Sequence, residues 1–392
     1  MKKLAIIGRG TAGCYAASHF SALTDFDIEL YYDPDTKVQT VGESGNLSLP
    51  ESLFRNLGIH YANKDELLDA TFKVGIKKSN WYKGETFFNY FPPGRVSYHF
   101  HAYKLQNLIL ERLKDRIKII PEKIDTDSLD ADYIMDCSGK PGVYNDFEYL
   151  TDKDDSIPVN AVHVTECPWE HPQFQTTQVI ARPYGWVFGI PLANRLSVGY
   201  LYNQNINTLD EVKEDVLNVF EYLKVIPSDR TQSFDFKNYY RKKNFTDRIA
   251  YNGNSSFFLE PLEATSIWTM NFIQSTAYDV WVNNKPIDQA NFEYSKNLKE
   301  IENCLMLHYF AGSIFKTEFW DFAGKRAENN MRAALKNKDF LKMLEVSKRL
   351  DIKNPSPEAL KTVYGIWYAP IWRNHMDAWG LYDKIKTINN MR

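Results

Sequence analysis

The stretch that decides the fold is "LAIIGRGTAGCYAASHFSAL", residues 4–23. The apolar run at 4–7 predicts a buried strand, the glycines after it predict a tight turn, and residues 14–23 have the apolar spacing of a helix. The run "FDIELYYD" at 26–33 predicts a second strand. Strand, helix and strand in this order predict a β-α-β unit with parallel strands at the start of the chain.

The turn "GRGTAG" satisfies the pattern G-x-G-x-x-G through Gly8, Gly10 and Gly13. Glycine lets backbone pass where a Cβ would clash, and the N-terminus of the following helix faces a pyrophosphate. The pattern alone is common, but its place between a strand and a helix predicts a dinucleotide site that includes Thr11 and Ala12. The alternative is a glycine-rich turn that serves only packing.

An acid at the end of the second strand usually hydrogen-bonds the ribose of such a cofactor. That position holds Tyr32 here, and Asp33 follows it. We expect Asp33 to bind the ribose, although an Asp-Pro pair also starts turns. No second glycine pattern follows, so the sequence predicts one nucleotide site and no separate nicotinamide site.

The composition excludes several classes of protein. The chain has 392 residues, 44% of them hydrophobic, with a net charge of -3 and a pI near 6.3. This charge makes neither nucleic acid nor an anionic membrane the expected partner. No apolar run approaches the roughly 20 residues that cross a bilayer, so we expect a soluble protein. The four cysteines form no C-x-x-C pair, which predicts no metal site and fits a reduced, cytoplasmic setting.

Short apolar runs continue through the first part of the chain, and helical segments dominate after about residue 287. The predicted strands are 71–77, 118–121, 133–139, 161–166, 177–183, 185–191 and 196–202, and the predicted helices are 101–114, 209–224, 292–310, 327–350 and 357–368. The fold class is therefore α/β: a Rossmann-type core with mixed sheets and a helical C-terminal part. We expect a core at 1–287, interwoven with a substrate-side sheet at about 60–120 and 155–245, and a helical subdomain at 288–392.

Seven motifs, in one order along the chain, resemble the flavin-dependent halogenases, the tryptophan-halogenase-like family. They are "GRGTAG", "TVGESGNLSLPESLFRNLGI", "TFKVGIKKSNW", "SYHFHAYKLQNLIL", "DCSG", "GWVFGIPL" and "FLEPLEATSI". The resemblance implies a flavin-monooxygenase-like core that binds FAD. It also implies an oxidoreductase that uses reduced FAD, O2 and a halide ion (chloride, bromide or iodide) to make hypohalous acid. The expected partners are a small electron-rich aromatic substrate and a separate flavin reductase that supplies the reduced FAD.

The resemblance also implies the two catalytic residues. Lys73, in "TFK", would carry the halogen to the substrate; taken alone, a strand lysine is expected to face solvent. Glu263 would polarise the halogenating species or take the proton from the cationic ring intermediate. Glu260 would brace the loop, which without the resemblance is expected to be a surface loop. Thr265 and Ser266 fall where backbone N–H groups of the family hold the halide.

Further flavin contacts follow from the other motifs. Gly42 and Glu43 lie in the segment similar to the family's G-E-A-T, and Trp186 and Pro191 lie in the segment similar to W-x-W-x-I-P. In the family that segment keeps the substrate away from the flavin. Phe188 stands where a second tryptophan is usual.

Two rival hypotheses remain open at the level of sequence. The substitution at Phe188 keeps an FAD-dependent aromatic monooxygenase possible, in which the substrate lies directly over the flavin. The substitutions at Tyr32, Asn254 and Ser266 keep a non-catalytic flavin-binding relic possible.

Overall fold

The computed structural model describes residues 1–36, 45, 55–58, 68–92, 94–139 and 146–390. Within it the chain forms two compact units. The first unit comprises Met1–Lys73, Arg95–Glu148 and Tyr239–Lys296, and the second comprises Val74–Gly94, Tyr149–Asn238 and Asn297–Arg392. The chain therefore passes from one unit to the other several times. The division at residue 287 that the sequence suggested stays a prediction.

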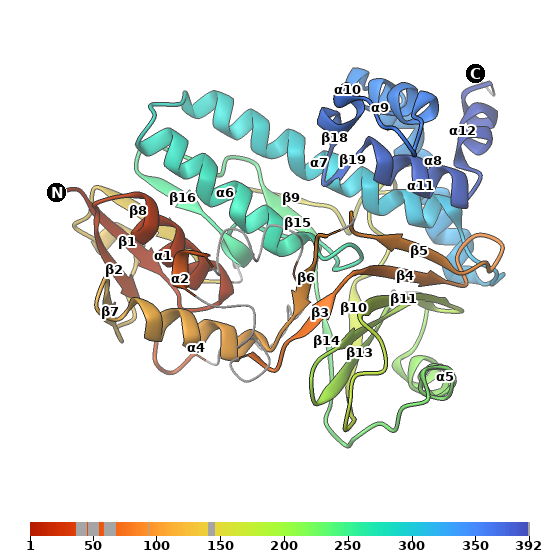
Figure 1. The fold of residues 1–392 in the computed structure, drawn as a ribbon, viewed down its shortest axis with the longest axis horizontal. Helices are drawn as coiled ribbons and strands as arrows, with labels where there is room; N and C mark the ends of the chain where they lie inside the picture. The colour runs from red at the N-terminus through yellow and green to blue at the C-terminus, as the bar shows by residue number, and fades with distance from the viewer. Residues whose placement is uncertain (37–44, 46–54, 59–67, 93, 140–145, 391–392) are drawn as a thin grey trace. The chain divides into compact units, whose positions relative to one another are not determined.

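The first unit contains a five-stranded sheet in the order β16-β8-β1-β2-β7 (Figure 1). Its strands are β16 (Ile249–Tyr251), β8 (Tyr133–Asp136), β1 (Lys3–Ile7), β2 (Asp27–Tyr31) and β7 (Lys118–Ile120). All four neighbouring pairs are parallel. The apolar run of β1 is buried because a parallel sheet is covered on both faces. The β-α-β unit predicted at the start of the chain is confirmed.

Helices α1 (Thr11–Leu23), α4 (Ala102–Leu113) and α6 (Thr265–Trp281) pack together in the first unit. The small residues of α1, such as Ala16 and Ala17, are fully buried and allow this close approach. Further described elements of the unit are α2 (Arg55–Leu57), β3 (Thr71–Lys73), β6 (Ser97–His99), η3 (Thr126–Ser128), most of β9 (Phe147–Tyr149), β15 (Tyr239–Arg241), η4 (Gly253–Ser255) and β17 (Phe257–Phe258).

The second unit is built on a seven-stranded sheet in the order β14-β10-β13-β12-β11-β4-β5 (Figure 1). Its strands are β14 (Thr231–Asp235), β10 (Ala161–Pro168), β13 (Arg195–Tyr202), β12 (Gly185–Pro191), β11 (Thr176–Arg182), β4 (Gly75–Ser79) and β5 (Phe87–Tyr90). Helix α5 (Leu209–Leu223) covers one face, where Val187 joins its apolar cluster. The alternate residue Trp186 faces the other way and donates a hydrogen bond to Tyr309 of α7 (Ile287–Ala311) at 3.0 Å.

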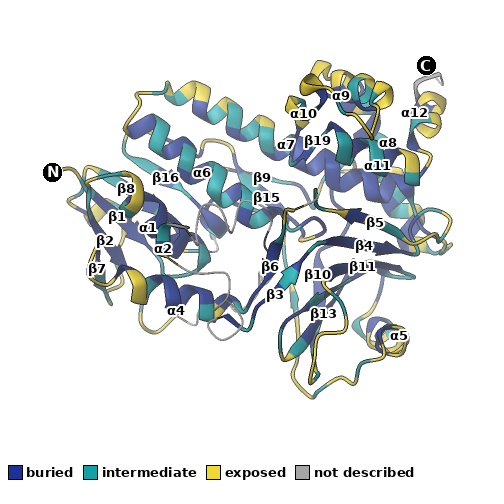
Figure 2. Ribbon diagram, viewed as in Figure 1, coloured by how far each residue is buried: buried dark blue, intermediate teal, exposed yellow. Residues whose placement is uncertain are grey.

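The C-terminal part is helical, as predicted, except at two places. The expected helix at 327–350 is interrupted at 335–337. This part contains the end of α7, α8 (Glu318–Ala334), α9 (Lys338–Arg349), α10 (Pro357–Lys361), α11 (Ala369–Ala378) and α12 (Leu381–Asn390). Figure 2 shows that buried and exposed residues alternate along these helices. The expected helix at 357–368 is wrong beyond Lys361, because a hairpin of β18 (Val363–Tyr364) and β19 (Trp367–Tyr368) turns at Gly365 with φ +60.

The predicted strand at 71–77 is in fact two strands that belong to different sheets. β3 pairs with β6, whereas β4 pairs with β11 and β5. The break falls at Val74, next to Gly75. A Cβ on Gly75 would stand 2.4 Å from the carbonyl oxygen of Asn89, so this crossing of backbones requires glycine.

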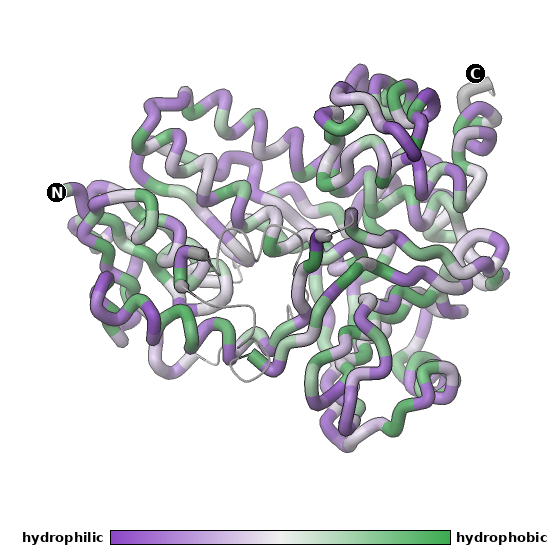
Figure 3. Tube along the Cα trace, viewed as in Figure 1, coloured by the Kyte–Doolittle hydropathy of each residue, from purple (hydrophilic) through white to green (hydrophobic). Residues whose placement is uncertain are grey.

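Hydropathy follows burial along the described part of the chain, with apolar residues concentrated in the strands and the inner faces of helices (Figure 3). No described helix combines the length and the apolar character needed to span a bilayer.

Candidate nucleotide and catalytic site

Two of the three glycines in the first turn serve the close packing of strand and helix. A Cβ on Gly8 would stand 2.2 Å from the carbonyl oxygen of Cys137, and one on Gly13 would stand 1.8 Å from that of Gly8. Both distances are far below van der Waals contact, so neither position accepts a side chain. These glycines let β1, α1 and the end of β8 approach one another.

Gly10 differs from its neighbours, because no described atom lies within 4 Å of where its Cβ would stand. It is the N-cap of α1, and no described side chain caps this helix. The first N–H groups of α1 lack intrahelical acceptors, as at any helix start, and the positive end of the helix dipole lies behind them. This arrangement fits a pyrophosphate, which needs close approach to backbone N–H groups.

Two further segments of the first unit complete the surroundings of this turn. Ser255 Oγ accepts a hydrogen bond from the Gly139 N–H at 3.0 Å and lies 3.1 Å from an oxygen of Asp136. A Cβ on Gly253, which has φ +60, would stand 2.7 Å from the Cβ of Ala12. Thr11 Oγ1 accepts a hydrogen bond from the Gln106 side chain at 3.0 Å. Residues from "GRGTAG", from "DCSG" and from 253–255 therefore lie side by side.

The Cys14 thiol of α1 is not a candidate nucleophile. Burial raises the pKa of Cys14 to about 12, so the thiolate is scarce at neutral pH. Its sulfur lies 3.2 Å from the carbonyl oxygen of Arg9, which makes it a packing residue of the turn.

Lys73 ends β3 and is buried, with 1% of its surface exposed. Its Nζ donates a hydrogen bond to the carbonyl oxygen of Gly45 at 3.0 Å. Neighbouring His99, on β6, is fully buried, and burial together with the charge of Lys73 holds the pKa of His99 well below its usual value. The expectation that a strand lysine faces solvent is wrong here, because β3 turns its Phe72 outward instead.

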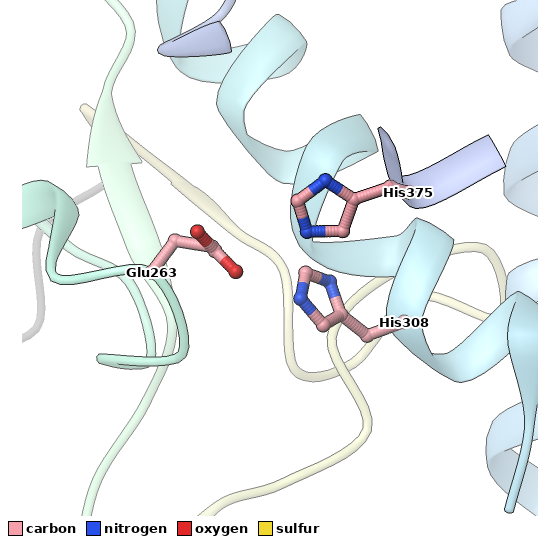
Figure 4. Close-up of side chains that lie close together, drawn as sticks. All are labelled: Glu263, His308 and His375. Atoms are coloured by element: carbon pink, nitrogen blue, oxygen red, sulfur yellow. The ribbon is translucent and has the colours of Figure 1, made fainter. Parts of the chain in front are cut away.

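The stretch with the two glutamates is a buried turn, not the surface loop that composition suggested. Glu260 is 0% exposed and Glu263 is 6% exposed. Ala264 follows with φ 53 and caps α6, which begins at Thr265. The first N–H groups of α6, at Thr265 and Ser266, lack intrahelical acceptors as at any helix start. Figure 4 labels Glu263 on the turn before this helix.

Trp186 and Pro191 lie at the two ends of β12 in the second unit, and both are buried. Phe188, between them, lies against the sheet, because a Cβ on Gly199 of β13 would stand 2.1 Å from its ring. The proposed flavin contacts of Trp186 and Pro191 stay predictions. Gly42 and Glu43 lie outside the described residues.

Sequence reasoning missed a buried cluster of the second unit, which we call the Lys78 cage: Lys78, Phe87, Trp367, His375 and Trp379. Lys78 is 0% exposed, and its Nζ lies 2.5 Å from His375 Nε2 and 5.5–5.8 Å from the centroids of the three aromatic rings. The Trp367 and His375 rings stack at 4.2 Å.

The tautomer of His375 follows from its second contact. Its Nδ1 lies 2.8 Å from the carbonyl oxygen of Ile371, which only accepts, so Nδ1 carries the hydrogen and Nε2 accepts from Lys78. His308 on α7 lies beside it, with ring centroids 5.8 Å apart (Figure 4). Lys78 and His375 are 297 residues apart, so their pairing gives no local sequence signal.

The fold and the glycine turn define a class, the proteins with a Rossmann-type dinucleotide-binding unit. The family model described as tryptophan halogenase matches residues 3–118 and 104–354. The chain therefore belongs to the tryptophan halogenase family, and it is a flavin-dependent halogenase, an oxidoreductase by class.

Individual relatives agree with this assignment at low identity. Tryptophan 7-halogenase RebH from Lentzea aerocolonigenes is 22% identical over 95% of this chain and 87% of its own length. The tryptophan halogenase structure from Shewanella frigidimarina is similar with a TM-score of 0.78 at 18% identity, covering 100% of this chain and 93% of the other. The flavin-dependent halogenase Xcc4156 from Xanthomonas campestris has a TM-score of 0.77 at 18% identity, covering 97% and 89%. These structural similarities support the assignment of the fold.

Proposed function

We propose that the protein halogenates a small electron-rich aromatic compound of the indole, pyrrole or phenol type, with FAD reduced by a separate flavin reductase. When bound, the reduced flavin supplies, with O2, the oxidising power that turns halide into hypohalous acid. The observation that carries the proposal is the burial of both Lys73 and Glu263 in the same compact unit as the glycine turn. Ionisable side chains are seldom fully buried, and where they are buried near a ligand site they are candidates for a functional role.

The turn and two helix starts would bind the cofactor and the anion. The N-terminus of α1, where no described atom lies within 4 Å of the Cβ position of Gly10, would hold the pyrophosphate. The first N–H groups of α6, at Thr265 and Ser266, would hold the halide, because the positive end of the helix dipole favours an anion. Ser266 adds a hydroxyl where the family has glycine, so it would narrow this anion pocket.

Lys73 would carry the oxidised halogen. Its amine can hydrogen-bond hypohalous acid or react with it: the N–H gives up its proton, an N–halogen bond forms, and water leaves. The hydrogen bond to the Gly45 carbonyl supports this role, since it holds the amine in one orientation. The halogen then passes as an electrophile to the aromatic carbon, and the amine nitrogen keeps the electron pair.

Glu263 would complete the reaction as general base. After the carbon–halogen bond forms, the ring carries a positive charge and one extra hydrogen, and a carboxylate that takes this proton restores aromaticity. Burial at 6% exposure supports the role, because a site that excludes bulk water protects the ring intermediate and the reactive halogen from side reactions.

The test is a panel of indoles, pyrroles and phenols incubated with chemically reduced FAD, O2 and bromide, followed by mass spectrometry. We expect the bromine isotope pattern in at least one product with wild-type protein, none with Lys73→Ala, and the wild-type yield with Lys77→Ala as control. Lys77 lies on the neighbouring strand and contacts Tyr222 at the surface. Products with added oxygen and no bromine would favour the aromatic monooxygenase instead.

A further inference from the structure

The ribose end of the nucleotide site departs from the general pattern of Rossmann-type units. There, an acid at the end of the second strand binds the ribose hydroxyls, and an arginine nearby accommodates a phosphate on the ribose. β2 ends at Tyr31, and Tyr32 holds the position of the acid.

An arginine lies over this tyrosine. The guanidinium carbon of Arg9, the residue between Gly8 and Gly10, lies 4.8 Å from the centroid of the Tyr32 ring. Arg9 Nη2 donates to Asn107 Oδ1 at 3.4 Å. Its Nε is buried, and no described residue accepts a hydrogen bond from it. A cation therefore lies where an acid is usual.

Asp33 does not replace the missing acid, because its carboxylate already contacts Asp35 and Lys123. One oxygen accepts a hydrogen bond from the Asp35 N–H at 2.9 Å, and the other lies 3.5 Å from Lys123 Nζ. The backbone hydrogen bond from Asp35, followed by contacts with Thr36 and Lys123, holds the pKa of Asp33 below its usual value. This geometry is that of an Asp-Pro turn.

We propose that Arg9 and Tyr32, and not Asp33, recognise the adenosine ribose, and that this end of the site accepts a phosphate on that ribose. The ligand class is an adenine nucleotide with a ribose phosphate, which competes with FAD. A guanidinium binds phosphate through two parallel hydrogen bonds, whereas a carboxylate would repel it. The inference rests on the proposed function only in taking FAD as the resident nucleotide.

The experiment compares AMP with adenosine 2′,5′-bisphosphate and adenosine 3′,5′-bisphosphate, each binding to the purified protein by calorimetry. FAD and FMN are titrated by flavin fluorescence, which needs no turnover. We expect one of the two bisphosphates to bind about tenfold more tightly than AMP, which is about 1.4 kcal/mol. The bisphosphate with the higher affinity identifies which ribose hydroxyl faces Arg9.

Single-residue variants show which side chains cause the preference for a bisphosphate over AMP. Arg9→Met should remove the bisphosphate preference and weaken FAD by about tenfold while leaving FMN, which lacks the adenosine, unchanged. Tyr32→Glu restores the usual acid and should reverse the preference. Asp33→Ala, and Arg112→Met at the exposed end of α4, should bind every ligand like wild type.

Two results would overturn the inference. One is that both bisphosphates bind more weakly than AMP, and the other is that Asp33→Ala loses as much FAD affinity as Arg9→Met. A protein that binds the nucleotides as expected and halogenates nothing would contradict the proposed function and leave this inference standing.

Discussion

Two buried lysines, five positions apart in sequence, lie in different units and in different chemical surroundings. Lys73 ends β3 in the first unit, and a backbone carbonyl accepts its hydrogen bond. Lys78 lies on β4 in the second unit, where His375 Nε2 accepts its hydrogen bond and aromatic rings surround its ammonium. The break at Val74 directs the two side chains into these separate environments.

The difference suggests different roles for the two amines. A carbonyl acceptor orients the Lys73 amine, which suits an amine that must react. Three aromatic faces and a histidine stabilise the Lys78 ammonium through cation–π contacts and a hydrogen bond, which suits a structural cation. The predictions below test this division from the largest expected effect to the smallest.

Glu263→Gln should lower the halogenation rate with reduced FAD by a hundredfold or more, because an amide does not take up the ring proton. The folded state should remain, since the amide has nearly the same shape. Single-turnover product formation by mass spectrometry measures the rate, and circular dichroism checks the fold. A Glu263→Gln rate within threefold of wild type would remove Glu263 from the mechanism.

Gly75→Ala should destabilise the protein by about 3 kcal/mol, because the new Cβ would clash with the backbone of β5 at Asn89. The same change at Gly58, which also has positive φ but no described atom within 4 Å of its Cβ, is the matched control and should cost about 1 kcal/mol. Urea unfolding gives both values. Equal losses would show that the break between the two lysine strands is not specified at Gly75.

Lys78→Met should destabilise the protein by about 1–3 kcal/mol, because His375 Nε2 is then buried without its donor. The loss should shrink in the double variant Lys78→Met with His375→Leu, where both partners of the bond are replaced by apolar groups. Thermal or urea unfolding of the single and double variants measures the coupling. Additive losses would show that the short contact between Lys78 and His375 contributes nothing.

The stability of the first unit should fall as pH drops below about 6.5. Burial, and then the charge of Lys73, lowers the pKa of His99 in the folded state. Below pH 6.5 His99 therefore binds a proton in the unfolded chain but stays neutral in the folded chain, which favours unfolding. The slope from this one group is at most about 1.4 kcal/mol per pH unit. Urea unfolding of His99→Gln between pH 7 and 5 should lack that contribution; an unchanged slope would contradict it.

Much of the fold could be predicted because its signals are local. The strand, the glycine turn and helix α1 follow one another within "LAIIGRGTAGCYAASHFSAL", and α4 and α5 have regular apolar spacing. The sequence did not predict helix α6. Its N-cap, Ala264, has a left-handed backbone conformation, and the helix start has neither a capping side chain nor an acid in its first turn. The hairpin at Gly365 was missed for the same kind of reason, since its strands are two residues long.

The candidate site was only partly predictable. The family motifs gave Lys73 and Glu263, but not that both are buried, since burial depends on strands and helices distant in sequence. The Lys78 cage could not be predicted at all, because the partners of Lys78 come from β5, β19, α11 and the C-cap of α11, which are distant in sequence. Arg9 lies within the predicted turn, yet only the ring contact with Tyr32 gives it a role.

The most direct test of the central claim locates the oxidised halogen. Protein with reduced FAD, O2 and bromide but no aromatic substrate is freed of small molecules and titrated with a thiol, which consumes one oxidising equivalent per halogenated amine. We predict a titratable equivalent in wild type and in Lys78→Met, and none in Lys73→Met. An equivalent that persists in Lys73→Met and disappears in Lys78→Met would contradict the assignment of the two lysines.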